Sequence, residues 1–508
     1  MSVKWWNPAT WIKKETKARS YEGAGKGRRH DGWTTTSASA NSLVGSHAGL
    51  LRQRSRDLLR NNAYAAAAIR ALTSNIVGDG IKPKSNTGDQ QLDAEVDRLW
   101  KQWERVASGT LPVGFYGLQA LAVRSFLESG EVLLRRRRRR RVDALPVPMQ
   151  IQILEADQLD ATKNEVLNDS GARIVQGVEF SPTERRVAFH ILRNHPGETV
   201  VQLRNGREVV RVFAEDIAHL YEPQRPGQVR GVPWLAPAIR RFRDLDDYED
   251  AELVRKKVEA CVAAFVIGDE EAEEGIAPKV EDSDGNPIET LEPGLIAYTR
   301  GGKQVVFNQP HSVGGYDAYK RAELQSIAAA VGMTYELLSG DLSKVNFSSI
   351  RAGLIEFRRM VSAMRANLVI PMMCDPVWRW FIEAAIADGS LPKPIAGTTE
   401  DVYRVKWTAP RFEEVDREKD AKADREELAS AGGFRSQLAS KGIDFEEWIA
   451  EEIETRERLS EAGISFPWLS GGSTSAPMAA QDEEQAPEEI DEQPTEQAPE
   501  EDEETAAA

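Results

Sequence analysis

The sequence predicts an α+β protein that is mainly helical, with its strands gathered in two regions. Three observations support this fold class. Leucine and alanine recur at helical spacing after residue 49. Short apolar segments separated by Gly, Pro and Asn cover 130–222, as expected of strands joined by turns. Long charged helices flank a second strand-rich segment, 264–312. At 508 residues the chain is too long for one ordinary core, so we expect two or three domains.

Three helices are expected before residue 130. The first lies in AGLLRQRSRDLLRNNAYAAAAIRALTSNIVGDG, where apolar residues keep one face and Gly78 and Gly80 end the pattern. The second covers about 89–107 and the third about 116–129. The strand-rich region 130–222 then follows.

Long helices dominate the second half of the chain. Pro233 suits the start of a helix over 233–263, whose narrow apolar stripe among many charges favours contact with another helix. The remaining elements are expected in this order: a Gly-, Pro- and Asp-rich β insertion over 264–312, a helix over 314–338, a polar loop, a helix over about 348–387, a strand near 402–408, and helices over 413–462. Pro371 is expected to kink or interrupt the longest of these helices.

Charge is distributed unevenly along the chain. The formal net charge is −16, but residues 481–508 hold thirteen Asp or Glu and no Lys or Arg, so the rest carries only −3. That C-terminal segment has one large apolar residue, Ile490, and we expect it to be disordered because it cannot bury enough surface. Residues 1–40 carry a surplus of five positive charges and are interpreted as an arm.

The sequence gives little sign of catalysis. No P-loop or G-x-S-x-G motif is present, and the six histidines lack the spacing of a metal site. The two cysteines, Cys261 and Cys374, lie in apolar contexts, which predicts no disulfide framework and a reducing compartment. Glu155 and Asp157 could form an acid pair, although a solvated strand end is the more common arrangement. We therefore expect no catalytic residues, no metal site and no cofactor, and a protein that is not an enzyme.

Seven consecutive arginines, Arg135 to Arg141, stand inside this acidic protein. They follow GEVLL and precede VDALP, which places them in a strand and turn. Alternation along a strand would direct Arg135, Arg137, Arg139 and Arg141 to one face and Arg136, Arg138 and Arg140 to the other. Three interpretations remain open: an exposed hairpin whose arginines pair with carboxylates of a neighbouring element or subunit, a DNA contact, or a targeting signal.

Three motifs in a fixed order carry a family resemblance. The most specific is LLSGDLSKVNFSSIRAGLIEFRR, residues 337–359, in which a Gly-Asp pair, polar residues and Asn-Phe-Ser-Ser-x-Arg open a long helix. The residues of this motif are Gly340, Asp341, Asn346, Phe347, Ser348, Ser349 and Arg351. The second motif consists of Gly231, Pro233, Leu235 and Ala238. The third consists of Trp407, Pro410, Asp416, Lys419 and Ala423, with Arg417 where a proline is usual. Together these motifs, spread over most of 40–470, resemble phage portal proteins of the lambda-type family.

The resemblance implies a mainly helical portal fold with a β-rich wing and clip that assembles into a ring, usually of twelve subunits. The implied divisions are an N-terminal arm (1–48), a wing (49–232), a first stem helix (233–263), a clip (264–312), a second stem helix (313–338), a tunnel loop (339–348), a wing helix and strand (349–412), a crown (413–470) and a disordered acidic tail (471–508).

The resemblance also implies a function. A portal ring occupies one capsid vertex of a tailed phage or prophage, and DNA is packaged and ejected through it. The expected partners are further copies of the chain, double-stranded DNA, the terminase large subunit, the head–tail connector, and the major capsid and scaffold proteins, with no membrane. The expected location is the virion, and the host cytoplasm during assembly. The alternatives are another head–tail connector or a packaging enzyme.

Specific residues are expected to carry these roles. The residues expected to line the DNA channel are Asp341, Ser343, Lys344, Val345 and Asn346. A channel for sliding DNA must not grip it, and a ring multiplies every lining cation, so a near-neutral body is suitable. For that reason we expect Arg135, Arg136, Arg137, Arg138, Arg139, Arg140 and Arg141 to contact other subunits or the shell.

Overall fold

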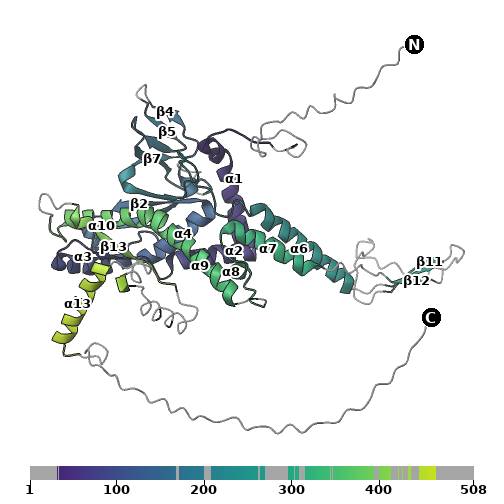
Figure 1. Ribbon diagram of the computed structural model, residues 1–508. Helices are drawn as coiled ribbons and strands as arrows, with labels where there is room; N and C mark the ends of the chain where they lie inside the picture. The colour runs from purple at the N-terminus through teal and green to yellow at the C-terminus, as the bar shows by residue number, and fades with distance from the viewer. Residues whose placement is uncertain are drawn as a thin grey trace, which may run out of the picture. The chain divides into compact units, whose positions relative to one another are not determined.

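A computed structural model gives the fold of the chain (Figure 1). The residues that it describes are 31–32, 34–167, 171–198, 208–260, 264–268, 296–301, 304–307, 315–343, 345, 347–393, 400–412, 422, 426, 433–435 and 445–464. The chain divides into two compact units, residues 1–413 and 414–508. Every helix in the described stretches falls short of the length and apolarity that a membrane span requires.

The first unit contains most of the helices. They are α1 (Ala40–Asn61), α2 (Ala63–Val77), α3 (Gln90–Trp103), α4 (Phe115–Ser129), α6 (Ile239–Ala260), α7 (Tyr316–Val331), α8 (Tyr335–Ser339), α9 (Phe347–Met364), the π-helix η8 (Arg365–Cys374) and α10 (Asp375–Asp388). The short 3₁₀ turns are η4 (Glu104–Val106), η5 (Arg141–Asp143), η6 (Ala156–Gln158), η7 (Ala214–Asp216) and η9 (Asp401–Tyr403).

The segment expected to form the first helix forms two, α1 and α2. Asn62 separates them, with an extended backbone at φ −108° and ψ 122°. Its side-chain oxygen accepts a hydrogen bond from the Ala65 N–H at 2.8 Å, which is the arrangement of a helix N-cap. The side-chain amide also donates to Asp246 on α6 at 2.6 Å. The expectation of one continuous helix was wrong because apolar spacing continues across the cap, and Gly78 ends α2 as expected.

The main hydrophobic core lies among α2, α3, α4, α9 and α10. Its centre is an aromatic cluster in which neighbouring ring centroids are 5.0–6.0 Å apart, contributed by Trp100, Trp103, Phe115, Trp378 and Phe381. The Trp103 indole N–H donates to the Met149 carbonyl at 2.7 Å, so this ring is buried without an unpaired donor. The core therefore joins the N-terminal helices to elements almost 300 residues further along the chain.

Two antiparallel sheets make up the strand-rich region. The first has the order β3-β2-β9, from β2 (Glu131–Arg138), β3 (Met149–Glu155) and β9 (Ile217–Tyr221). The second has the order β4-β5-β6-β7-β8, from β4 (Glu165–Val166), β5 (Arg173–Val175), β6 (Val178–Phe180), β7 (Arg186–Leu192) and β8 (Val209–Phe213). Alternation along β2 directs Val132 and Leu134 into the main core and Leu133 into a second, smaller core shared with the five-stranded sheet.

The paired helices α6 and α7 run side by side (Figure 1). Arg241 pairs with Glu323 at 2.9 Å and Lys320 with Glu249 at 2.7 Å, while Tyr248 stacks on Tyr316. The first of these helices begins at Ile239 and not at Pro233. Residues 234–238 form turns, because Pro237 has no N–H to donate and disfavours helical backbone at the residue before it.

The apolar stripe of α6 is covered along part of its length only. Leu235, Phe242 and Leu245 are fully buried, whereas Leu253 and Val254 are 51% and 59% exposed. Beyond the helix lies a three-stranded sheet of order β11-β10-β12, from β10 (Ala264–Gly268), β11 (Ile296–Gly301) and β12 (Gln304–Phe307). The β10 strand is parallel to β11 and antiparallel to β12. Strands in 264–312 were expected, and the rest of that range lies outside the described residues.

The long helix expected over 348–387 is interrupted, as expected, at Pro371. It consists of α9, the ten-residue π-helix η8 that contains the proline, and α10. The strand expected near 402–408 is β13 (Val405–Thr408), which pairs antiparallel with β1 (Lys82–Ser85). In the second unit, the described helix is α13 (Phe445–Glu461); most of 413–444, where further helices were expected, lies outside the described residues, as does the acidic tail.

Candidate functional site

The loop that follows α8 is shaped by local hydrogen bonds. Gly340 ends α8 with a left-handed backbone, φ 71°. The Asp341 carboxylate then accepts hydrogen bonds from the Ser343 N–H at 3.0 Å, the Ser343 hydroxyl at 2.6 Å and the Tyr335 hydroxyl at 3.1 Å. These bonds, first of all those from Ser343, lower the pKa of Asp341. The carboxylate therefore stays ionised, and the loop presents a negative charge beside exposed Leu342.

The structure places the other expected loop residues only in part. Lys344 and Asn346 lie outside the described residues, as do the side chains of Phe347 and Ser348 in the first turn of α9. Val345 is half-buried. Ser349 and Arg351 follow on α9 and are exposed. Nearby, a Cβ at Gly353 would lie 2.7 Å from the Thr334 side chain, so α9 passes very close to the residue that caps α8.

The arginine run lies on β2 as far as Arg138. One face of the strand packs toward α10: Arg136 pairs with Asp216 at 2.6 Å and with Glu383, and Trp380 lies beneath it. Only 7% of the Arg136 side chain is exposed. Arg138 follows on the same face and is paired with Asp216 at 3.3 Å. These arginines are therefore neutralised by carboxylates of the same chain.

The opposite face of β2 carries Arg135 and Arg137, and Arg139 follows directly after the strand. Arg137 donates to the Gln152 side-chain oxygen at 2.7 Å, and Arg139 to that of Gln150 at 2.9 Å. Within the described stretches, no carboxylate lies within ion-pair distance of these three guanidinium groups. The expected division into two faces is thus present from Arg135 to Arg138.

The last two arginines leave the strand. Arg141 begins the turn η5 and pairs with Asp388 at the end of α10, at 2.6 Å, instead of continuing the face of Arg139. Arg140 is 84% exposed and lies 4.0 Å from Asp143. A pocket of about 400 Å³ opens between β2 and α10, lined on one side by Arg138 and Arg139 and on the other by Glu383 and Asp388. Contact with another subunit or the shell stays a prediction for all seven arginines.

A buried ion network at the start of β2 was not foreseen. Glu131 is fully buried and accepts hydrogen bonds from Arg230 at 2.7 and 2.9 Å. It also lies 2.9 Å from His219 Nε2 and 3.4 Å from Arg52. The remaining Arg230 donors reach the carbonyls of Ala156, Leu159 and Gln176. Only a charged residue directly before the apolar run VLL hints at this network in the sequence.

Charge and burial oppose each other at this network. Burial alone would raise the pKa of Glu131, but the charge of Arg230 and the hydrogen bond with His219 outweigh it and hold the pKa well below its usual range. Burial lowers the pKa of His219, and Glu131 offsets that effect only in part. The network is therefore a fixed structural element with an ionised carboxylate at its centre.

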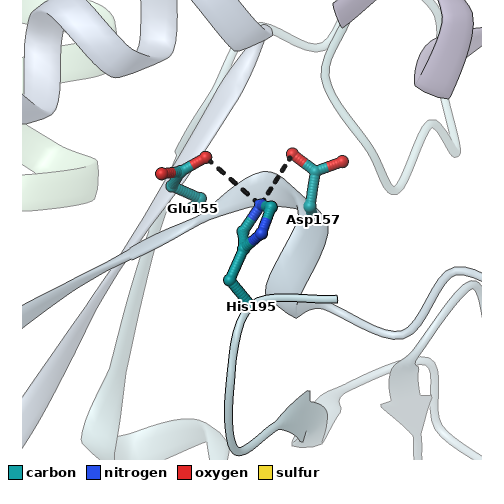
Figure 2. A group of neighbouring side chains, drawn as sticks. All are labelled: Glu155, Asp157 and His195. Atoms are coloured by element: carbon teal, nitrogen blue, oxygen red, sulfur yellow. Dashed lines mark ion pairs between the residues drawn. The ribbon is translucent and has the colours of Figure 1, made fainter. Parts of the chain in front are cut away.

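Glu155, Asp157 and His195 form a second cluster, shown in Figure 2. Their possible ligand atoms lie within 4.8 Å of one another, which is close enough for a metal site. However, Arg56 already pairs with Glu155 and with Asp157, each at 2.7 Å, and Arg52 lies 3.3 Å from Asp157. The charges of Arg52 and Arg56 outweigh burial and lower the pKa of Asp157. The carboxylates are thus balanced by arginines, and the cluster is an ion-pair network continuous with that of Glu131.

A buried arginine at the start of the π-helix was also missed. Arg365 donates to the carbonyls of Asn75 and Ile76 at 2.8 Å each and of Pro410 at 3.0 Å. It therefore satisfies the unpaired carbonyls at the end of α2, a role that only a forked side chain with several donors fills. The sequence offers no local signal, because the partners are about 290 and 45 residues away.

Comparisons with known proteins point in one direction. The family model described as phage portal protein, lambda family, matches residues 26–365. The chain is 26% identical to a probable portal protein of Halomonas phage phiHAP-1, over 91% of each chain. It is 22% identical to the portal protein of Escherichia phage N15, over 93% of this chain and 97% of the relative. It is also 22% identical to portal protein B of Escherichia phage lambda, over 91% and 94%.

Solved structures with a similar chain come from gene transfer agent (GTA) particles. The neck of the native particle, computed with C12 symmetry, matches with a TM-score of 0.43 and 12% identity, over 77% of this chain and 93% of that chain. The neck of the empty particle, computed with C6 symmetry, matches with a TM-score of 0.41 and 13% identity, over 78% and 93%.

Proposed function

The chain belongs to the lambda family of phage portal proteins, and we propose that it forms the ring at one capsid vertex through which DNA is packaged and ejected. The observation that carries this proposal is the extent of the match. The family model covers two thirds of the chain, and three relatives named as portal proteins match over at least 91% of their own length. A match of this extent concerns the whole protein and not one shared module.

The divisions expected from the sequence are retained as part of this proposal. The strand-rich region and α9–α10 would form the wing, α6 and α7 the two stem helices, and 264–312 the clip. The stem assignment is supported by the paired charged helices, with the first helix shortened to begin at Ile239. Residues 339–348 would form the tunnel loop, and 413–470 the crown.

The exposed end of the α6 stripe supports assembly of several copies. Leu253 and Val254 are more than half exposed although they continue a stripe whose first part is fully buried. Each buried methylene contributes about 0.8 kcal/mol, so covering both side chains with a neighbouring helix would stabilise a ring. Assembly as a ring, usually of twelve subunits, is therefore the arrangement that we propose.

The proposed partners follow from this arrangement. Double-stranded DNA would pass through the channel, and the clip would meet the terminase large subunit and the head–tail connector. The wing would meet the major capsid and scaffold proteins. The protein would act in the virion, at the portal vertex, after assembly in the host cytoplasm. We assign no reaction to the chain.

Two alternatives are weaker. Another head–tail connector would fit a structural role, but such proteins are usually much shorter and lack two long helices around a strand insertion. A packaging enzyme would require a nucleotide or metal site. In the described part of the chain the nearest candidate is the cluster of Glu155, Asp157 and His195, whose carboxylates are already paired with Arg52 and Arg56.

Negative-stain electron microscopy of the purified full-length protein tests the proposal. We expect closed rings with a central channel. Val254→Asp should abolish the rings, because it places a charge on the contact surface of the stem. Val166→Asp, at a 75% exposed residue on β4, is the matched control and should keep them. Monomers only, or rings that are indifferent to Val254→Asp, would contradict the proposed assembly.

A further inference from the structure

Asn62 joins two parts of the fold through the two ends of one amide group. Its oxygen accepts a hydrogen bond from the Ala65 N–H at 2.8 Å and so caps α2. Its nitrogen donates to the Asp246 carboxylate on α6 at 2.6 Å. Only 4% of Asn62 is exposed. Because the amide is planar and both of its ends are bound, a shift of α6 acts directly on the first turn of α2.

The helix that pairs with α6 contacts the same end of α2. The Lys320 ammonium on α7 lies 5.6 Å from the centre of the Tyr64 ring, and it pairs with Glu249 on α6 at 2.7 Å. Tyr64 is the second residue of α2. The paired helices α6 and α7 therefore hold the N-terminal turn of α2 at two points, through Asn62 and through Tyr64.

The loop at 340–343 depends on α2 at both of its ends. Helix α8 leads into the loop and α9 follows it, and both of these helices pack against α2 (Figure 1). Leu338 of α8, Phe357 of α9 and Ile69 of α2 are buried in the same core. A displacement of α2 would therefore act on the helices at both ends of the loop.

The C-terminal end of α2 is fixed as well. Arg365, at the start of η8, donates to the carbonyls of Asn75 and Ile76. Helix α2 has 15 residues, so about 22 Å separates these carbonyls from the cap at Asn62. The chain also runs directly from α7 to α8, but Gly332 interrupts the helix there with a left-handed backbone, φ 80°. The position of α8 therefore depends on its packing against α2.

We propose that Asn62 is a positioning residue for the loop at 340–343, and that it transmits the position of α6 through α2 to α8 and α9. The bond to Asp246 is the step that the cap of α2 does not itself require. In a portal ring, this connection would couple the stem helices to the loop that faces the channel. That consequence rests on the proposed function, whereas the coupling between the helices and the loop does not.

Amide hydrogen exchange of the full-length protein tests the proposal. Asn62→Ser keeps a residue that caps helices well but is too short to reach Asp246. Asn61→Ser is the matched control, since the Asn61 amide donates the same kind of bond to Asp57 at 2.8 Å, at the surface of α1. Asp246→Ala removes the acceptor and leaves the cap in place, whereas Asp246→Asn keeps an oxygen that can accept the bond.

Asn62→Ser and Asp246→Ala should speed exchange at 335–343 by about 2- to 10-fold, the effect expected from the loss of one hydrogen bond, and leave exchange in β2 and β3 unchanged. Asn61→Ser and Asp246→Asn should match the unaltered chain. The proposal is overturned by unchanged exchange at 335–343, by faster exchange confined to α2, or by an equal rise in every segment or in Asn61→Ser.

Two features keep the result decisive. If Asn62→Ser does not fold, Asp246→Ala decides, because it leaves the cap of α2 intact. The measurement does not require rings, so an unaltered protein without rings would contradict the proposed function and leave the exchange result valid.

Discussion

Gly130 and Gly231 meet backbone to backbone where the strand-rich region begins and ends. A Cβ at Gly231 would lie 1.9 Å from the carbonyl oxygen of Gly130, and a Cβ at Gly130 would lie 2.3 Å from the carbonyl carbon of Val232. Gly130 also has a left-handed backbone, with φ 86°. This contact explains why a glycine opens the motif at 231: the two segments could not approach so closely around any side chain.

Gly231→Ala should lower the free energy of unfolding by about 1–3 kcal/mol, because the added methyl group would force the two backbones apart. Gly49→Ala is the control, since a Cβ there meets nothing within 4 Å and lies inside α1. The control should be neutral or more stable by up to about 1 kcal/mol. Chemical denaturation gives the free energy of unfolding of both variants. If the two variants were equally stable, the steric explanation would be contradicted.

Arg365→Lys should destabilise the protein even though it keeps the positive charge. A lysine has no forked guanidinium, so it would leave at least one buried carbonyl of Asn75, Ile76 or Pro410 unpaired, at a cost of about 1–3 kcal/mol. Arg359→Lys, on a side chain that is 72% exposed, should change stability by less than about 0.5 kcal/mol. Urea denaturation provides the measurement: the midpoint of Arg365→Lys should fall, while the slope of unfolding free energy against urea concentration should stay the same.

The Glu131 network should make the fold sensitive to acid. The pKa of His219 is lowered from 6.5 and that of Glu131 is lowered from 4.5, so both groups bind fewer protons in the folded state than in the unfolded state. Their contribution is therefore complete above pH 6.5, decreases below it as His219 resists protonation, and decreases further below pH 4.5.

His219→Gln separates these two effects. It should flatten the stability profile between pH 6.5 and 4.5, relative to the unaltered chain, and leave the fall below pH 4.5 in place. Thermal melts across this range give the profile. If stability depends on pH equally in both proteins between pH 6.5 and 4.5, titrating groups other than His219 cause that dependence.

Lys344→Ala should leave ring assembly intact and alter DNA packaging or retention, because Lys344 is the only lysine or arginine of the 339–348 loop. Electron microscopy checks the rings, and the DNA content per filled head checks retention. Lys101→Ala, at an exposed position on α3, is the control and should change neither. Failure of Lys344→Ala to assemble would assign the residue a structural role.

Deletion of residues 471–508 should leave the fold and the ring intact. The segment has almost no apolar surface to bury, and exposed ion pairs contribute about 0–1 kcal/mol each. The melting temperature should therefore change little. A large drop in melting temperature would show that the segment packs into the fold.

Local pattern predicted much of the fold. The helices around Leu99 and Leu118 follow apolar spacing because each buries one face. The strand around Leu133 follows from the short apolar run VLL, which is buried on both faces. The long helix is interrupted at Pro371 because proline has no backbone N–H to donate. The helix break at Asn62 did not stand out, since the polar cap lies within an otherwise regular pattern. Helix α6 starts later than expected because of Pro237. The sequence interpretation took Pro233 as the first helical residue and did not consider the second proline.

Long-range electrostatics could not be read from the sequence. Arg52, Arg230 and Arg365 look like ordinary surface arginines, yet all three are buried. The partner of Arg230, Glu131, is 99 residues away, and that of Arg365, Ile76, is 289 residues away. No local pattern encodes such pairs. The family motif at 340–351, by contrast, was visible in the sequence because its residues are adjacent in the chain.

The π-helix η8 constrains the number of residues between α9 and α10. A π turn holds one residue more than an α turn, so the ten residues from Arg365 to Cys374 determine the angle at which α10 emerges from α9. An α-helix turns by about 100° per residue, and removal of one residue from this stretch would rotate α10 by about that angle. Trp378 and Phe381 would then leave the aromatic cluster. The length of this stretch is therefore as important to the core as the guanidinium of Arg365 at its start.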